Sequence, residues 1–134
     1  MPEEYQPRKR SWPEKFRETF HGLWVGVRGQ SSFSFHFVAT IAVIVAGIVL
    51  KVTRVEWYIL ILCITSVLTA EMFNSALEVL AKAVDKNRNQ YLADSLNISS
   101  AAVLVTSIGS SLTGAIIFIH RLGIRLEWWV ESGR

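Results

Sequence analysis

The chain has 134 residues, of which 51% are hydrophobic, and a formal net charge of +3. This composition is too apolar for a soluble domain of this size, and the small net charge gives no indication of nucleic-acid binding. Because Cys63 is the only cysteine, an intramolecular disulfide and a two-cysteine redox motif are both excluded.

The first predicted element is an amphipathic helix over residues 12–29. Apolar side chains recur there at steps of three and four between charged ones, and Pro13 suits a first helical turn. This pattern favours a helix that lies in the membrane interface, and the alternative is a cytosolic helix that packs on another surface.

Three apolar segments follow, and each is long enough to cross a membrane. They cover residues 33–50, 57–84 and 96–119, with a polar loop from Asp85 to Asp94 between the last two. The first begins too far from the N-terminus for a cleavable signal peptide, so we expect it to be retained. The sequence therefore predicts an all-α membrane protein with a single domain over residues 1–134.

The distribution of Lys and Arg predicts the topology. The segment before the first span carries six basic residues, whereas the first loop has only Lys51 and Arg54. Basic residues are enriched in cytoplasmic segments, so the N-terminus and the second loop are predicted to be cytoplasmic and the C-terminus outside.

The second span contains the most informative pattern, a group of polar side chains at Glu71, Asn74 and Glu78. Offsets of three and seven residues place all three on one helical face. An acidic residue at mid-membrane costs roughly 2.5–3.5 kcal/mol, so this face is expected to have a function. Counting from Trp57 puts Glu71 roughly 21 Å along the helix and Glu78 roughly 31 Å, at the cytoplasmic interface. Cation binding and proton transfer are the natural uses of such a pair.

Other polar residues are predicted near the same level. Gln30 precedes the first span and Asn97 opens the third, so both are candidates to converge on Glu78. Lys82 follows Glu78 by one turn, which favours an intrahelical ion pair over a contact to a phosphate. A lone histidine in the first span, His36, is interpreted as a satisfied interfacial residue rather than as a ligand.

Taken together, these features resemble the small bacterial integral-membrane lipid kinases, the diacylglycerol kinase and undecaprenol kinase family. The resemblance covers residues from about 14 to 120. It rests on the three spans, the preceding amphipathic helix, the run from Glu71 to Glu78, and the sequence Ser-Ala-Ala-Val-Leu at residues 100–104. It implies a homotrimer in the bacterial inner membrane whose active sites combine residues of neighbouring protomers.

The resemblance also implies a reaction, the transfer of the ATP γ-phosphate to a lipid hydroxyl with Mg²⁺. Glu71 then matches the proposed general base, Glu78 a carboxylate that binds Mg²⁺, and Asn74 the asparagine between them. Asn74, Asn97 and Lys82 become candidates for substrate or nucleotide contacts. Gln30 becomes a second candidate metal ligand beside Glu78.

At several positions the chain departs from the family pattern. The family usually has a second metal-binding glutamate where this chain has Gln30, and an arginine where it has Ser34. It has an aspartate at the position of Lys82, and a Lys-Asp pair where this chain has Leu96-Asn97.

Three functional hypotheses follow from the sequence. The first is an active membrane lipid kinase, supported by the Glu71, Asn74 and Glu78 trio. The second is a catalytically impaired relative that binds nucleotide or lipid or serves as a scaffold, supported by the substitutions at Gln30 and Asn97. The third is a small ion- or proton-coupled membrane protein that uses Glu71. Because an isolated protomer is expected to leave Glu71 facing lipid, self-association is predicted to bury it.

Overall fold

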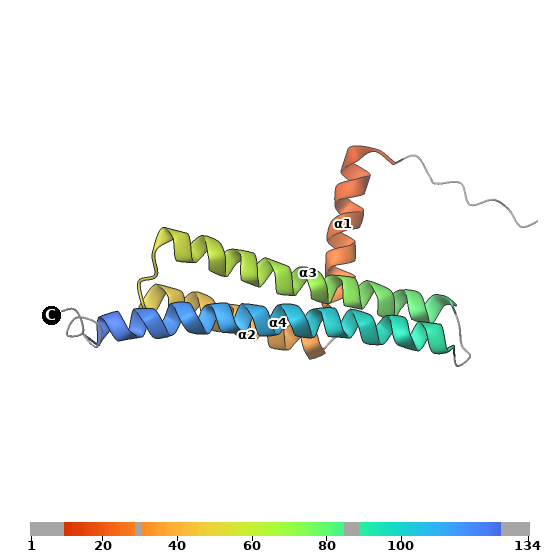
Figure 1. Cartoon of the computed structure of the whole chain (residues 1–134). Helices are drawn as coiled ribbons and strands as arrows, with labels where there is room; N and C mark the ends of the chain where they lie inside the picture. Colours follow the sequence, from red (N-terminus) through yellow and green to blue (C-terminus); the bar gives the residue numbers. More distant parts are fainter. Residues whose placement is uncertain (1–9, 29–30, 85–88, 127–134) are drawn as a thin grey trace, which may run out of the picture.

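The computed structural model describes residues 10–28, 31–84 and 89–126. Within these ranges the chain is helical throughout apart from short turns, and it contains no strand (Figure 1). The helices are α1 (Trp12–Val27), α2 (Ser31–Val49), α3 (Arg54–Val84) and α4 (Gln90–Arg125). The last three are long and apolar enough to cross a membrane. The predicted architecture of a surface helix and three membrane spans is confirmed.

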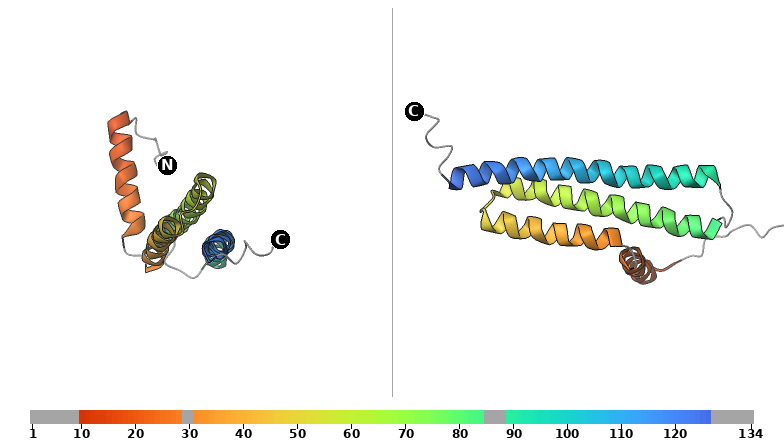
Figure 2. Two further views of the ribbon diagram at one scale, coloured as in Figure 1. Left: turned by 90° about the vertical axis from the view of Figure 1, so that its left-hand side faces the viewer. Right: turned by 90° about the horizontal axis from the view of Figure 1, so that it is seen from below.

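The amphipathic helix α1 does not run along the bundle but extends away from it, across the direction of the three long helices (Figures 1 and 2). At its N-terminus the Glu14 carboxylate accepts hydrogen bonds from the backbone N–H and the hydroxyl of Ser11, at 2.9 and 3.0 Å. These bonds, chiefly the one from the backbone, hold the pKa of Glu14 below its usual value. The apolar stripe of α1, which includes Trp12, Phe16 and Phe20, is exposed, as expected for a helix that lies in the membrane interface.

The three long helices lie side by side, and α3 packs mainly against α4 (Figure 2). The apolar core lies toward the end of the bundle that contains the α2–α3 turn. Its buried residues are Val52, Leu60 and Ile117, and partly buried Val43, Trp57 and Phe118 pack against them. Gly47 permits the close approach of α2 to α3, because a Cβ at this position would lie 2.8 Å from the Trp57 ring.

The turn between α2 and α3 is defined by backbone hydrogen bonds. The Val52 N–H donates to the Gly47 carbonyl and the Lys51 N–H to the Ile48 carbonyl, with Lys51 in the left-handed region at φ 52°. This is a Schellman motif, which satisfies the last carbonyls of a helix. A capping box follows at once, in which the backbone N–H and hydroxyl of Thr53 donate to the Glu56 carboxylate.

The start of α4 differs from the sequence prediction. Residues 90–94, which were expected to belong to a polar loop, form the first turn of the helix. The reason is a cap at Asn89, whose side-chain oxygen accepts from the N–H groups of Tyr91 and Leu92 at 3.0 and 3.4 Å.

The contact between α1 and α3 shows at which height along the bundle α1 lies. Gly26 of α1 lies against Met72 of α3, where an added Cβ would approach the Met72 sulfur to 2.9 Å. The end of α3 and the start of α4 project beyond this level (Figure 1). If α1 marks the membrane surface, Glu71 lies at that surface and Glu78 lies about 9 Å farther along α3 than Met72, on the aqueous side.

Candidate active site

Glu71 lies inside the bundle of a single chain. It is 1% exposed, and Asn74 and Ser75 on the following turn are also buried. The expectation that an isolated protomer leaves Glu71 facing lipid is therefore wrong. α2 covers this part of α3 and shields the carboxylate without the help of a second copy.

The side chain that approaches Glu71 from α2 is His36. Its Nε2 atom lies 3.6 Å from Oε1 of Glu71, and its side chain is also largely buried. Among the described residues, this Oε1 atom accepts no hydrogen bond. The imidazole is held by an edge-to-face contact with the Phe35 ring. Sequence reasoning missed this role of His36, because a lone histidine in an apolar span carries no pattern that identifies its neighbour.

Asn74 connects α4 to the second carboxylate. The Ser99 hydroxyl donates to Asn74 Oδ1 at 2.6 Å, and the Asn74 amide nitrogen donates to Glu78 Oε1 at 3.1 Å. Ser100 makes a longer hydrogen bond to the same Asn74 oxygen, at 3.4 Å. This chain of hydrogen bonds fixes the orientation of the amide and holds one oxygen of Glu78.

Two other predicted site residues, Asn97 and Lys82, do not join this group. Asn97 is exposed, and it is Ser99 that contacts Asn74 instead. The buried residues of α4 include Ser99, Gly114 and Ile117, so Asn97 does not lie on the face that packs inward.

Lys82 is exposed, and within the described part of the chain no ion pair joins it to Glu78, contrary to the favoured interpretation. Gln30 lies outside the described residues.

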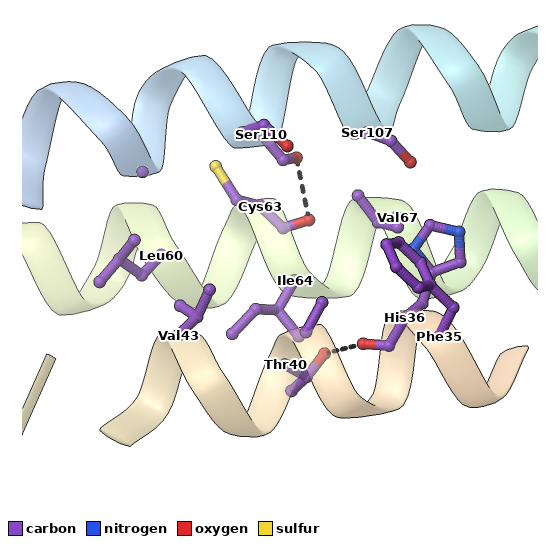
Figure 3. A pocket seen from close by; sticks show the side chains of 13 residues that line it. Phe35, His36, Thr40, Val43, Leu60, Cys63, Ile64, Val67, Ser107 and Ser110 are labelled. Atoms are coloured by element: carbon purple, nitrogen blue, oxygen red, sulfur yellow. Dashed lines mark hydrogen bonds between the residues drawn. The ribbon is translucent and has the colours of Figure 1, made fainter. Parts of the chain in front are cut away.

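A cavity of about 210 Å³ extends from His36 into the bundle between α2, α3 and α4 (Figure 3). Apolar side chains such as Leu60, Ile64 and Val67 line most of it. α4 contributes small polar side chains to the lining, among them Ser107. The Ser107 hydroxyl is buried and has no hydrogen-bond partner among the described residues. An apolar space therefore begins beside the residue that approaches Glu71.

A separate groove of about 550 Å³ runs between α3 and α4. Asn74 and Ser99 contribute to it together with Tyr91 and Asp94 from the start of α4. In the described residues no three His, Cys, Asp or Glu side chains come close enough to hold a metal ion by themselves. A cation at Glu78 would thus need further ligands, which a phosphate and water can supply.

Comparison of the sequence with known proteins assigns the chain to a family. The profile of prokaryotic diacylglycerol kinase matches residues 17–118, which include both carboxylates and the serines of α4. The chain belongs to this family. It is accordingly a multi-pass membrane protein of a lipid kinase family, and Glu71, Asn74 and Glu78 all lie within the matched region.

A curated member of the family gives a second comparison. The undecaprenol kinase of Bacillus subtilis (strain 168) is 26% identical to this chain over 109 residues, which cover 81% of this chain and 89% of that protein. The similarity thus extends over most of both chains.

Proposed function

We propose that this protein is an active lipid kinase that transfers the γ-phosphate of ATP to the hydroxyl of a membrane lipid. The observation that carries the proposal is the carboxylate of Glu71, which is buried and lies two turns before Glu78 on one helix. Its Oε1 atom accepts no hydrogen bond from any residue that the structure describes. A base for a lipid hydroxyl must lie at the membrane surface, and the level of α1 supports this position for Glu71.

In the proposed reaction, the lipid hydroxyl gives its proton to Glu71. Its oxygen forms a bond to the γ-phosphorus, and the bond from that phosphorus to the bridging oxygen of ADP breaks. His36 positions the Glu71 carboxylate, and the cavity beside His36 takes the apolar part of the lipid. Phosphoryl transfer depends mainly on such positioning and on neutralisation of phosphate charge.

Glu78 is the residue that would hold Mg²⁺. Mg²⁺ in kinase sites is commonly bound by one or two carboxylates together with substrate phosphates and water, so a single carboxylate from this chain fits. When bound, the ion neutralises charge on the phosphates. Asn74 orients Glu78, and we propose that the groove between α3 and α4 takes the nucleotide.

The test is transfer of radiolabelled phosphate from ATP by the purified protein in mixed micelles. Two lipids are supplied separately, undecaprenol and a diacylglycerol, with and without a chelator of Mg²⁺. We expect one of the lipids to be labelled, and labelling to stop when the chelator is added. Failure to label either lipid over a range of protein and lipid concentrations contradicts an active kinase.

The second candidate is a family member that has lost activity. The substitutions at Gln30, Leu96 and Asn97 favour it, because they replace the residues that the family resemblance assigns to metal and phosphate binding. If the wild type is inactive, the triple variant Gln30→Glu, Leu96→Lys and Asn97→Asp restores the family pattern. Activity gained by this variant identifies a decayed kinase.

A further inference from the structure

Basic side chains gather at the end of the bundle opposite Glu71 and Glu78. A pocket of about 310 Å³ lies between the α2–α3 turn and the C-terminal end of α4. The described residues that line it are Leu50, Lys51, Arg121, Ile124 and Arg125, of which three are cationic and none is acidic.

The cations of this pocket are held by neighbouring groups. Arg121 donates from Nε to both carboxylate oxygens of Glu56, at 2.9 and 2.7 Å, and its Nη2 lies 2.7 Å from one of them. Arg125 donates from Nη1 to the backbone carbonyl of Val49 at the end of α2. Among the described residues here, three positive charges against the one carboxylate of Glu56 leave an excess of two. This excess favours the binding of an anion.

The surroundings of the pocket are apolar as well as basic. Leu50 and Ile124 form part of its lining, and the adjacent α2 side chains Ile48 and Val49 are 64% and 55% exposed. Since α2 and α4 are long enough to cross a membrane, this surface lies where hydrocarbon meets the headgroup layer. A free phosphate makes no favourable contact with the apolar side chains. A phospholipid can place its phosphate against the basic side chains and its acyl chains against the apolar ones at the same time.

We propose that this pocket binds the headgroup of an anionic phospholipid in the leaflet farther from Glu78. The phosphodiester would accept charge-assisted hydrogen bonds from Lys51 and Arg125. The predicted topology adds a reason, because it places these cations outside, where Lys and Arg are otherwise under-represented. The inference does not depend on the proposed kinase reaction.

The test uses the full-length protein in a neutral detergent and native mass spectrometry. Binding of phosphatidylglycerol is compared with that of phosphatidylcholine of the same acyl chains and with inorganic phosphate. We expect phosphatidylglycerol to bind in preference to both. Its dissociation constant should rise about fivefold for Lys51→Asn and about fivefold for Arg125→Gln. Asn tolerates the left-handed conformation of residue 51, so Lys51→Asn removes the charge without straining the turn.

Arg54→Gln is the matched control. Arg54 is exposed at the start of α3, at the same end of the bundle, and does not line the pocket. Its variant should bind phosphatidylglycerol like the wild type. An equal loss in Arg54→Gln, or equal binding of phosphatidylcholine, overturns the proposal. Inorganic phosphate that binds as tightly as phosphatidylglycerol overturns it in favour of a general anion site. If Arg125→Gln does not fold, Lys51→Asn alone decides the question.

Discussion

At the scale of single residues, His36 is the polar side chain of α2 that approaches the buried Glu71 carboxylate. Burying an ionised carboxylate without a partner is costly, and removing one member of a buried pair leaves the other uncompensated. His36 Nε2 is 3.6 Å from Glu71 Oε1, which is close enough to orient the carboxylate but too far for a hydrogen bond in this state. The distance leaves Oε1 able to accept a proton from a substrate hydroxyl.

Replacement of His36 tests its positioning role. In His36→Leu the Glu71 carboxylate loses its polar neighbour on α2, and kcat should fall roughly tenfold or more, with the KM for ATP little changed. His36→Gln keeps a side-chain donor and should retain most of the activity. Steady-state kinetics of the two variants make the comparison. Equal activity of both would show that His36 merely fills space.

The two serines near Asn74 provide a second test at this scale. Ser99→Ala removes the 2.6 Å hydrogen bond to Asn74, whereas Ser100→Ala removes only the longer one at 3.4 Å. Polar contacts between membrane helices contribute about 0.6 kcal/mol on average. We expect Ser99→Ala to lower the free energy of unfolding in mixed micelles by about that amount, and Ser100→Ala to change it much less. The reverse order would contradict the described role of Ser99.

The sequence predicts part of this site and leaves out the rest for a physical reason. Glu71, Asn74 and Glu78 share a face because their spacing follows the helical period. The choice of Ser99 over Asn97 depends on the rotation of α4 about its own axis. In a helix that is apolar on every side, polarity alone does not define which face packs inward. His36 is brought close to Glu71 by the packing of α2 on α3. No local sequence pattern predicts this packing.

At the scale of elements, the α2–α3 turn combines two motifs and one strained residue. Lys51 occupies the left-handed position of the Schellman motif, where glycine is the usual residue. Thr53 and Glu56 begin α3, and Glu56 also binds Arg121 of α4. The same carboxylate therefore caps one helix and joins it to the next.

Lys51→Gly should stabilise the protein. The left-handed conformation costs a residue with a Cβ about 1 kcal/mol, and glycine adopts it without this cost. We expect a higher midpoint of thermal unfolding, followed by circular dichroism in detergent. Lys51→Val, which is β-branched, should lower the midpoint. A Gly variant that is less stable than the wild type would show that contacts of the Lys51 side chain outweigh the strain.

The helices and their ends are determined by different local sequence signals. The existence and order of the four helices follow from the length and period of the apolar segments. The early start of α4 follows from the Asn89 cap, a signal outside the apolar segment on which the span prediction rested. The end of α1 at Val27 precedes the predicted end at residue 29 by two residues, which is within the ordinary variation of helix ends.

At the scale of the whole molecule, the long helices expose large apolar surfaces in a single chain. Phe37 on α2, Ile61 on α3 and Leu104 on α4 are examples. Lipid or further copies of the chain must cover these surfaces. The family resemblance implies a homotrimer, and we propose that the same assembly forms here.

Crosslinking in mild detergent, with light scattering of the same sample, tests this assembly. We expect species up to a trimer and a mass of three chains. Because Glu71 is already buried within one chain, the assembly is not required to shield it. A monomer that stays folded and transfers phosphate would contradict a site that is shared between protomers.

Glu71→Gln tests most directly whether Glu71 takes the proton of the lipid hydroxyl. This variant keeps the shape of the side chain but removes the base. Glu18→Gln, an exposed change on α1, is the matched control. Phosphate transfer and nucleotide binding are measured for both variants with the lipid that the wild type accepts. Glu71→Gln should lose about 10²–10⁴-fold in turnover, as is typical for loss of a general base, with nucleotide binding retained and Glu18→Gln unchanged. Wild-type turnover in Glu71→Gln would contradict the assignment.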